Sequence, residues 1–160
     1  MPGSQRVLFV CAGNICRSPM AEAFLRRLID ERPGLRHVEV FSAGTIASDG
    51  AGPLAQTVRV MQTDHGIDLT GHRARRLSSN LDADLVLAMD RHVSDEAREI
   101  GTSGALHLIG DFAGLPGEEV ADPYGGSLDD HRACASKVKR LVEAVAQKLE
   151  RPPFRFAART

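Results

Sequence analysis

Residues 7–19 read VLFVCAGNICRSP and join a short apolar run, a loop and the start of a helix. Ser18 followed by Pro19 predicts the helix N-terminus, because serine is a favoured N-cap and proline fits the first helical position. Cys11 and Arg17 therefore bracket a tight loop whose backbone N–H groups can turn inward. A loop of this kind at a helix N-terminus binds tetrahedral oxyanions. A thiol on its floor is placed to attack the central atom of such an anion.

The rest of the chain alternates between strand and helix signals. Short apolar runs predict strands at residues 6–11, 38–42, 83–89 and 105–109. Apolar positions at helical spacing predict helices between Pro19 and Arg32, from Leu54 to about His65, around residues 94–100 and from Cys134 to Leu149. The glycine-rich residues 43–53 and 110–127 predict loops between these elements.

Strands that alternate with helices imply right-handed crossovers and a parallel sheet with helices on both faces. The sequence therefore predicts an α/β fold with an open sheet. In such sheets, ligands bind beyond the carboxyl ends of the strands. Cys11, Ser42, Asp90 and the 110–127 loop all fall at the carboxyl ends of predicted strands, so we expect them at one edge of the sheet.

The composition fits one small domain, since 160 residues suit a single core. We assign residues 1–5 to an N-terminal extension, 6–150 to the domain and 151–160 to a basic, poorly ordered tail. A formal net charge of −1 gives no reason to expect a nucleic-acid partner. Three cysteines form no disulfide framework, and no early apolar run is long enough for a signal peptide or membrane span. We therefore expect a cytoplasmic protein without stable membrane insertion.

Cys11 and Arg17 have the chemistry of a phosphate site. A helix N-terminus and a nearby cation lower the pKa of a thiol, and Arg17 and the following helix supply both. The guanidinium can also donate two parallel hydrogen bonds to phosphate oxygens. Gly13 permits close approach of the backbone, and Asn14 tolerates a left-handed conformation while its side chain braces the loop. The Ser18 hydroxyl can cap the helix and donate to the Cys11 sulfur.

Two other kinds of site do not match the sequence. A nucleotide-binding loop would end in Gly-Lys-Ser or Gly-Lys-Thr, which the chain lacks. The six histidines show no paired ligand spacing, so we expect neither a metal nor another cofactor.

The segment CAGNICRSPMAE, residues 11–22, resembles the signature of the low-molecular-weight protein tyrosine phosphatases. Four later segments resemble further blocks of that family in the same order: Ser42-Ala43-Gly44, residues 71–75, residues 87–90 and Asp122-Pro123-Tyr124. The resemblance covers roughly residues 6–150. It implies a single α/β domain with a four-stranded parallel sheet, and hydrolysis of phosphomonoesters through a phosphocysteine.

The same resemblance implies roles for individual residues. Cys11 would be the nucleophile, Arg17 would bind phosphate and Asp122 would be the general acid. Phosphate and substrate would be bound by Ala12, Gly13, Asn14, Ile15, Cys16, Ser18 and Tyr124, with Ser42 and His72 in a supporting polar network. The expected partner is a phosphorylated protein substrate, and the sequence leaves the oligomeric state open.

Asp122 is also a good general acid on chemical grounds. A phenolate leaving group has a pKa near ~10, so an acid that protonates it speeds its departure by ~10²–10⁴-fold. Pro123 biases Asp122 towards an extended conformation, and the loop is long enough to reach over the pocket. The rival carboxylates of this region are Asp111, Glu118, Glu119 and Asp129, which fit solvated loop charges better.

Phosphotyrosine is the favoured substrate, because a nucleophile at the floor of a deep pocket rejects phosphoserine. Ile15 and Tyr124 are suited to the walls and could enclose a phenyl ring. However, Gly125-Gly126 after Tyr124, and the lack of an aromatic residue in residues 43–53, resemble the bacterial protein arginine phosphatases of the same family. Those enzymes place a threonine at the position of Ile15. Phosphoarginine therefore stays open as the alternative substrate.

Two further functions fit less well. Arsenate reduction on this scaffold needs additional cysteines to carry the oxidation outward, and residues 77–109 contain none. A non-catalytic phosphate-binding module would not need Cys11, Arg17 and Asp122 together.

The remaining cysteines have different expected roles. Cys16 could form a reversible disulfide with Cys11 that protects the thiolate from further oxidation, or it could simply pack behind the loop. Cys134 lies on the apolar stripe of the last helix and is expected in the core.

Overall fold

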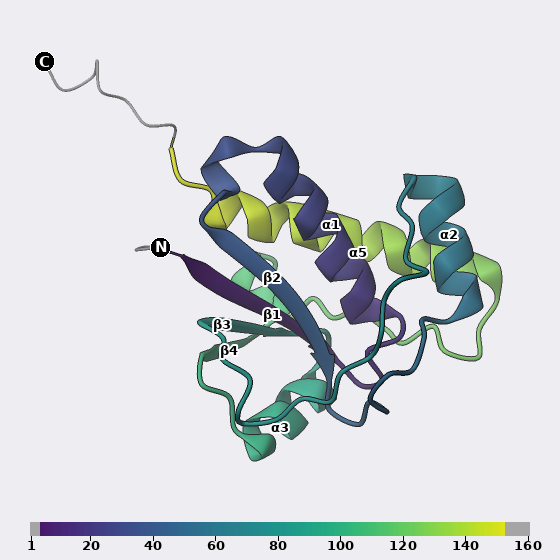
Figure 1. Ribbon diagram of the computed structural model, residues 1–160, viewed down its shortest axis with the longest axis horizontal. Coiled ribbons are helices and arrows are strands. Elements are labelled where there is room, and N and C mark those ends of the chain that lie inside the picture. Colours follow the sequence, from purple (N-terminus) through teal and green to yellow (C-terminus); the bar gives the residue numbers. More distant parts are fainter. Residues whose placement is uncertain (1–3, 153–160) are drawn as a thin grey trace, which may run out of the picture.

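The computed structural model describes residues 4–152. Its elements, in chain order, are β1 (Gln5–Cys11), α1 (Arg17–Glu31), the 3₁₀ turn η1 (Pro33–Leu35), β2 (Val38–Gly44), α2 (Ala55–His65), β3 (Leu85–Ala88), α3 (Arg91–Ile100), β4 (Ala105–Leu108), α4 (Ile109–Phe112) and α5 (Leu128–Leu149). Figure 1 shows them following the chain from β1 at the N-terminus to the long helix α5. The predicted residues 1–3 of the extension and 153–160 of the tail lie outside the described part.

The four strands form one parallel sheet in the order β2-β1-β3-β4. In this register, Val7 of β1 lies between Val40 of β2 and Leu85 of β3. The α/β class, the parallel direction and the four strands predicted from the sequence are thus confirmed. Because every strand runs the same way, all four carboxyl ends lie at one edge, and this edge holds the candidate site.

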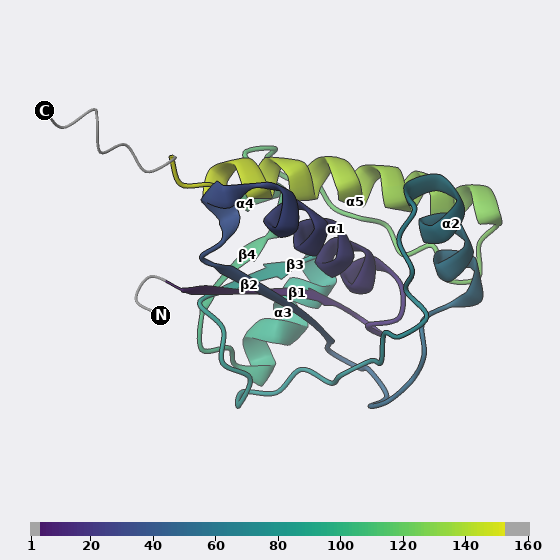
Figure 2. The same cartoon turned by 45° about the horizontal axis from the view of Figure 1, so that its top comes forward.

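Two apolar layers cover the sheet, one on each face. Side chains alternate along β1, so Val7 and Phe9 pack in the core below α1 and α5, whereas Leu8 and Val10 pack with the residues around α3. Figure 2 shows α1, α2 and α5 on one side of the sheet and α3 on the other. Because β1 is buried on both faces, its sequence is continuously apolar rather than alternating.

The structure corrects the predicted start of the first helix. Helix α1 begins at Arg17 with Cys16 as N-cap, so Ser18 is not the cap and Pro19 is not the first helical residue. The Ser18 hydroxyl is instead hydrogen-bonded to Cys11 and Asn14 of the loop. Proline is still accommodated, because the backbone N–H groups of the first helical turn need no partner within the helix.

Other boundaries differ by a few residues. The third strand is Leu85–Ala88, shorter than the predicted 83–89. The predicted loop 110–127 begins inside the short helix α4. The last helix starts at Leu128 rather than at the predicted Cys134, and Ser127 and Asp130 form a capping box at its N-terminus. The sequence analysis missed this first part of the helix because its residues are polar and precede the apolar stripe. No helix in residues 4–152 combines the length and apolarity needed to cross a membrane.

Candidate active site

We call residues 11–17, from the last residue of β1 to the first residue of α1, the phosphate loop. Asn14 at its centre has φ of 55°, the left-handed conformation that its sequence position suggested. Its side-chain amide donates to the hydroxyls of Ser18, at 2.8 Å, and Ser42, at 2.9 Å, and its amide oxygen accepts from the backbone N–H of Arg75. His72 Nε2 donates to the Asn14 carbonyl oxygen at 2.7 Å. Three separate segments thus hold the middle of the loop.

The segment after β2 supports the first half of the loop by close backbone contact. Thr45 N–H donates to the Cys11 carbonyl oxygen, and Ile46 N–H donates to that of Ala12, both at 3.0 Å. A Cβ atom at Gly44 would lie 2.4 Å from the Ala12 oxygen, so only glycine permits this approach. This explains why a glycine closes the Ser42-Ala43-Gly44 segment.

Cys11 lies at the floor of the loop and its side chain is buried. Its sulfur is 2.9 Å from the Ser18 hydroxyl oxygen and accepts from the Asn14 N–H at 3.3 Å. Burial raises the pKa of the Cys11 thiol, while the Ser18 hydroxyl, the Arg17 charge and the backbone amides lower it. The cation and the helix N-terminus that the sequence predicted do lower the pKa of Cys11, but burial raises this pKa and is the largest single effect. The thiolate therefore depends on every one of these donors.

Arg17 is fixed by two hydrogen bonds that both use Nη1. Its Nη1 donates to Asp90 Oδ2 at 2.7 Å and to the Val120 carbonyl oxygen at 2.8 Å. Burial lowers the pKa of Arg17, but its hydrogen bond to Asp90 and the surrounding negative charges outweigh this effect, so the pKa is raised. Asp90 also caps α3 by accepting from Val93 N–H. The sequence placed Asp90 at this edge but gave no sign that it pairs with Arg17.

Asp122 reaches the site from the loop before α5. Its Oδ2 lies 3.6 Å from Arg17 Nη2, and its side chain is 47% exposed. Its other oxygen accepts from Tyr124 N–H at 3.1 Å, which fixes the turn at Pro123. Among the carboxylates weighed from the sequence, Asp111 accepts from Gly117 N–H and Glu118 pairs with Arg140, so both are engaged elsewhere.

A pocket of about 220 Å³ opens above Cys11. The loop forms its floor, and its walls are apolar or aromatic: Ile15, Ile46, Leu54 and Tyr124, with Asp122 at the side. Ile46 is 61% and Tyr124 is 69% exposed, so both present apolar surface at the mouth. Tyr124 and Ile15 were predicted as walls. Ile46 and Leu54 were not, because they lie far from the loop in sequence and only the fold brings them there.

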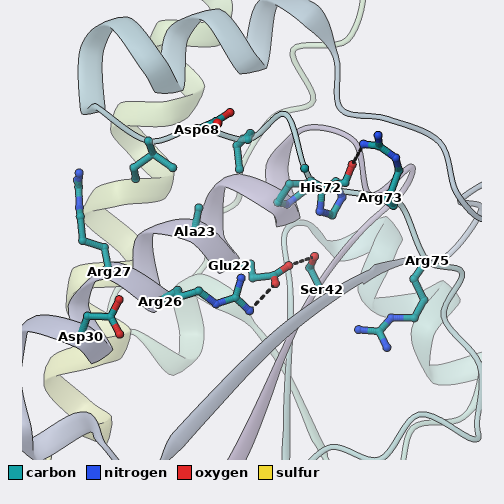
Figure 3. A pocket seen from close by; sticks show the side chains of 14 residues that line it. Glu22, Ala23, Arg26, Arg27, Asp30, Ser42, Asp68, His72, Arg73 and Arg75 are labelled. Atoms are coloured by element: carbon teal, nitrogen blue, oxygen red, sulfur yellow. Dashed lines mark hydrogen bonds and ion pairs between the residues drawn. The ribbon is translucent and has the colours of Figure 1, made fainter.

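A second, larger cavity of about 750 Å³ lies between α1 and residues 67–75, and Ser42 and His72, which support the phosphate loop, are among the residues that line it. Figure 3 shows Glu22 at its base, linked to Ser42 and to Arg26. Ser42 donates to Glu22 Oε1 at 2.5 Å, and Arg26 pairs with the other carboxylate oxygen at 2.8 Å. Glu22 therefore orients the hydroxyl that accepts from Asn14. The sequence analysis predicted Ser42 and His72 as supports but assigned Glu22 no role.

Cys16 and Cys134 are buried and, like Cys11, present as free thiols. The Cys16 sulfur accepts from the Thr57 hydroxyl at 3.1 Å, and Cys134 lies in the core as expected. Within residues 4–152, no group of three or more histidine, cysteine or acidic side chains is arranged to hold a metal ion. The candidate site therefore consists of a thiol, a guanidinium and a carboxylate around an anion-binding loop.

Comparison with known proteins agrees with this geometry. Residues 6–153 match the model of the low molecular weight phosphotyrosine protein phosphatase family. The chain is 38% identical to a probable low molecular weight protein-tyrosine-phosphatase of Ralstonia nicotianae, covering 86% of this chain and 91% of that protein. It is 34% identical to a protein-arginine-phosphatase of Geobacillus stearothermophilus, covering 91% and 96%. Among solved structures, a low molecular weight protein tyrosine phosphatase from T. tengcongensis superposes with a TM-score of 0.82 at 36% identity, covering 91% and 99%. The chain therefore belongs to the low molecular weight phosphotyrosine protein phosphatase family, and is a phosphoric monoester hydrolase.

Proposed function

We propose that the protein hydrolyses phosphotyrosine in proteins through a phosphocysteine formed on Cys11. The observation that carries this proposal is the convergence of three groups on one apolar-walled pocket. The Cys11 sulfur is at its floor, Arg17 also lines it, and Asp122 lies 3.6 Å from the Arg17 guanidinium. A cavity of about 570 Å³ is also lined by Cys134, Lys137 and Asp122, but none of its lining residues belongs to the phosphate loop.

In the first step, the Cys11 thiolate attacks phosphorus and the bond from phosphorus to the phenolic oxygen breaks. Asp122, in its protonated form, gives its proton to the departing oxygen, so tyrosine leaves as a neutral phenol. The loop amides and Arg17 hold the equatorial oxygens, where charge is spread in the transition state. Because Arg17 is already fixed by Asp90 and Val120, it needs no reorganisation as the reaction proceeds.

In the second step, water attacks the phosphocysteine and the phosphorus–sulfur bond breaks. The Asp122 carboxylate, left by the first step, accepts a proton from this water. The Cys11 thiolate is the leaving group and returns to its hydrogen bonds with Ser18 and the Asn14 N–H. Inorganic phosphate is released and Asp122 is again protonated.

The pocket walls favour a phenyl ring over a guanidinium. Ile15, Ile46 and Leu54 offer only carbon atoms to a side chain that enters, and Tyr124 adds an aromatic ring. A phosphoarginine side chain carries N–H groups that need acceptors, and among the side chains of these walls only Asp122 and the Tyr124 hydroxyl can supply them. Arginine phosphatase activity is the second candidate, because one similar protein is a protein-arginine-phosphatase and because Gly125-Gly126 follows Tyr124.

The proposal also includes the compartment of the enzyme, its partner and the extent of its catalytic domain. Free thiols at Cys11, Cys16 and Cys134 fit a reducing compartment, so we place the enzyme in the cytoplasm. Its partner is a phosphorylated protein, and residues 6–150 form the catalytic domain.

The test compares kcat/KM for matched phosphotyrosine and phosphoarginine peptides of the same sequence. We expect the phosphotyrosine peptide to be the better substrate, and Ile15→Thr to reduce the preference. Cys11→Ser is the control and should abolish hydrolysis of both peptides. A preference for phosphoarginine would reverse the substrate assignment, and activity in verified Cys11→Ser protein would refute the mechanism.

A further inference from the structure

Four side chains form a buried polar cluster behind the phosphate loop: Cys16 of the loop, Thr57 of α2, and His131 and Cys134 of α5. None of them takes part in the proposed reaction. Thr57 and His131 are fully buried, and Cys16 and Cys134 nearly so. Buried polar groups normally form hydrogen bonds with one another because leaving them unpaired is costly. Their contacts therefore indicate what the cluster does.

The hydrogen bonds of the cluster run in one direction. The Thr57 hydroxyl donates its only proton to the Cys16 sulfur at 3.1 Å. Its oxygen lies 3.1 Å from His131 Nδ1, so that nitrogen carries the proton and donates to Thr57. Cys134 lies one helical turn after His131 on α5. Every member is neutral in this arrangement.

The titration behaviour of the cluster fits neutral groups. The Cys134 thiol and burial raise the pKa of Cys16, and burial lowers the pKa of His131. His131 Nε2 has no hydrogen-bond partner in the described structure. An apolar side chain would avoid that cost, so the contribution of the imidazole to the cluster is its contact through Nδ1.

The cluster lies where the phosphate loop joins helix α1. Cys16 is the N-cap residue of α1, has no side-chain cap, and directly precedes Arg17. Ile15 directly precedes Cys16, and its carbonyl oxygen accepts a hydrogen bond from Leu54 N–H, at the start of α2, at 3.0 Å. The Asn14 supports hold the middle of the loop, whereas this cluster holds its end. A rotation at Cys16 would displace the Arg17 guanidinium.

We propose that Thr57 and His131 are positioning residues that act through Cys16 to hold the second half of the phosphate loop and, with it, Arg17. The proposal rests on the proposed function of the same site, since it assumes that the loop binds phosphate. It also gives Cys16 a structural role, while the reversible disulfide with Cys11 considered from the sequence stays a separate prediction.

The experiment measures inorganic phosphate binding to three variants. Thr57→Val keeps the shape of the side chain and removes the hydroxyl, whereas Thr57→Ser keeps the hydroxyl. Val145→Ala is the matched control, because it makes a cavity in α5 that lies 14 residues, or about 21 Å, from His131 along the helix. Phosphate affinity is read as protection of Cys11 from alkylation by iodoacetate, and as inhibition of p-nitrophenyl phosphate hydrolysis. Thermal unfolding is followed in parallel.

We expect Thr57→Val to weaken phosphate binding about threefold to tenfold, as the loss of one buried hydrogen bond implies. Thr57→Ser should stay within about twofold of the wild type. Val145→Ala should lower the melting temperature without changing phosphate affinity. Unchanged affinity in Thr57→Val would overturn the proposal, and so would an equal loss in Val145→Ala, because that would indicate general destabilisation.

His131 provides a second pair of variants if Thr57→Val does not fold. His131→Asn keeps a donor near the position of Nδ1, and His131→Phe removes it. We expect only His131→Phe to weaken phosphate binding, and equal affinity in both variants would overturn the proposal. If the wild-type protein itself neither binds phosphate nor hydrolyses p-nitrophenyl phosphate, the proposed function fails instead.

Discussion

Replacement of Asp90 by alanine is expected to release the Arg17 guanidinium from its position in the site. Arg17 is 3% exposed, and Asp90 Oδ2, at 2.7 Å, is its only carboxylate partner within 3 Å in the described residues. Without Asp90, a buried cation would keep only the Val120 carbonyl oxygen and the more distant, half-exposed Asp122. The guanidinium should then turn towards Asp122 or solvent and away from the phosphate oxygens.

The magnitude follows from the two contacts of Asp90. Removal of one partner from a fully buried ion pair costs ~3–5 kcal/mol, and the 24% exposure of Asp90 reduces this to about 2 kcal/mol. Loss of the α3 cap at Val93 N–H adds about 1 kcal/mol. A total of about 3 kcal/mol corresponds to a melting temperature roughly 6–12 °C lower for a chain of this length. Displacement of Arg17 should reduce kcat/KM by roughly tenfold to a hundredfold.

Asp90→Asn separates the two effects. It retains an acceptor for Val93 N–H but removes the charge, so we expect a smaller thermal shift and most of the kinetic loss. The assays are thermal unfolding by circular dichroism and hydrolysis of p-nitrophenyl phosphate. Wild-type kcat/KM in correctly folded Asp90→Ala protein would show that Arg17 needs no fixing by Asp90, and would refute the reasoning.

Three further predictions concern single side chains. Asp122→Asn should slow turnover of aryl phosphates by ~10²–10⁴-fold while phosphate inhibition is unchanged, and the loss should shrink for substrates with more acidic phenols; equal loss for all phenols would contradict its role as the acid. Ser18→Ala should raise the pKa of Cys11 above that of the wild type, because the Ser18 hydroxyl lowers it; the pH dependence of iodoacetate alkylation measures this. His131 has a pKa lowered by burial, although the Asp130 and Asp122 charges raise it, so the unfolded state binds its proton more readily. Stability should therefore fall as the pH drops below the unfolded value of about 6.5, and unfolding curves of His131→Phe should lack this part of the pH dependence.

Much of the fold and the centre of the site follow from local patterns. The run of β-branched and aromatic residues before Cys11 predicted β1 because a strand buried on both faces needs no polar alternation. Asn14 was expected in a left-handed conformation because few other residues adopt it without strain, and its φ of 55° confirms this. The parallel direction of the strands followed from their alternation with helices, whereas the order β2-β1-β3-β4 was not predicted.

The errors arose where local patterns compete with contacts made across the fold. Ser18-Pro19 has the pattern of a capped helix start, but the Ser18 hydroxyl is engaged by Cys11 and Asn14, and the helix begins at Arg17. The net effect on the Cys11 pKa could not be foreseen, because burial depends on how closely β2 and α1 pack around the sulfur.

The sequence by itself determined the make-up of the anion-binding loop, because the thiol, the guanidinium and the residues between them occupy seven consecutive positions, residues 11–17. The conformation of such a short segment depends mainly on the backbone preferences of its own residues. Only the tertiary structure decided what fixes those groups. Asp90 on Arg17, Glu22 on Ser42 and the Thr57–His131 pair on Cys16 come from distant parts of the chain. Such contacts depend on the packing of whole helices against the sheet, and no periodicity along the chain records them.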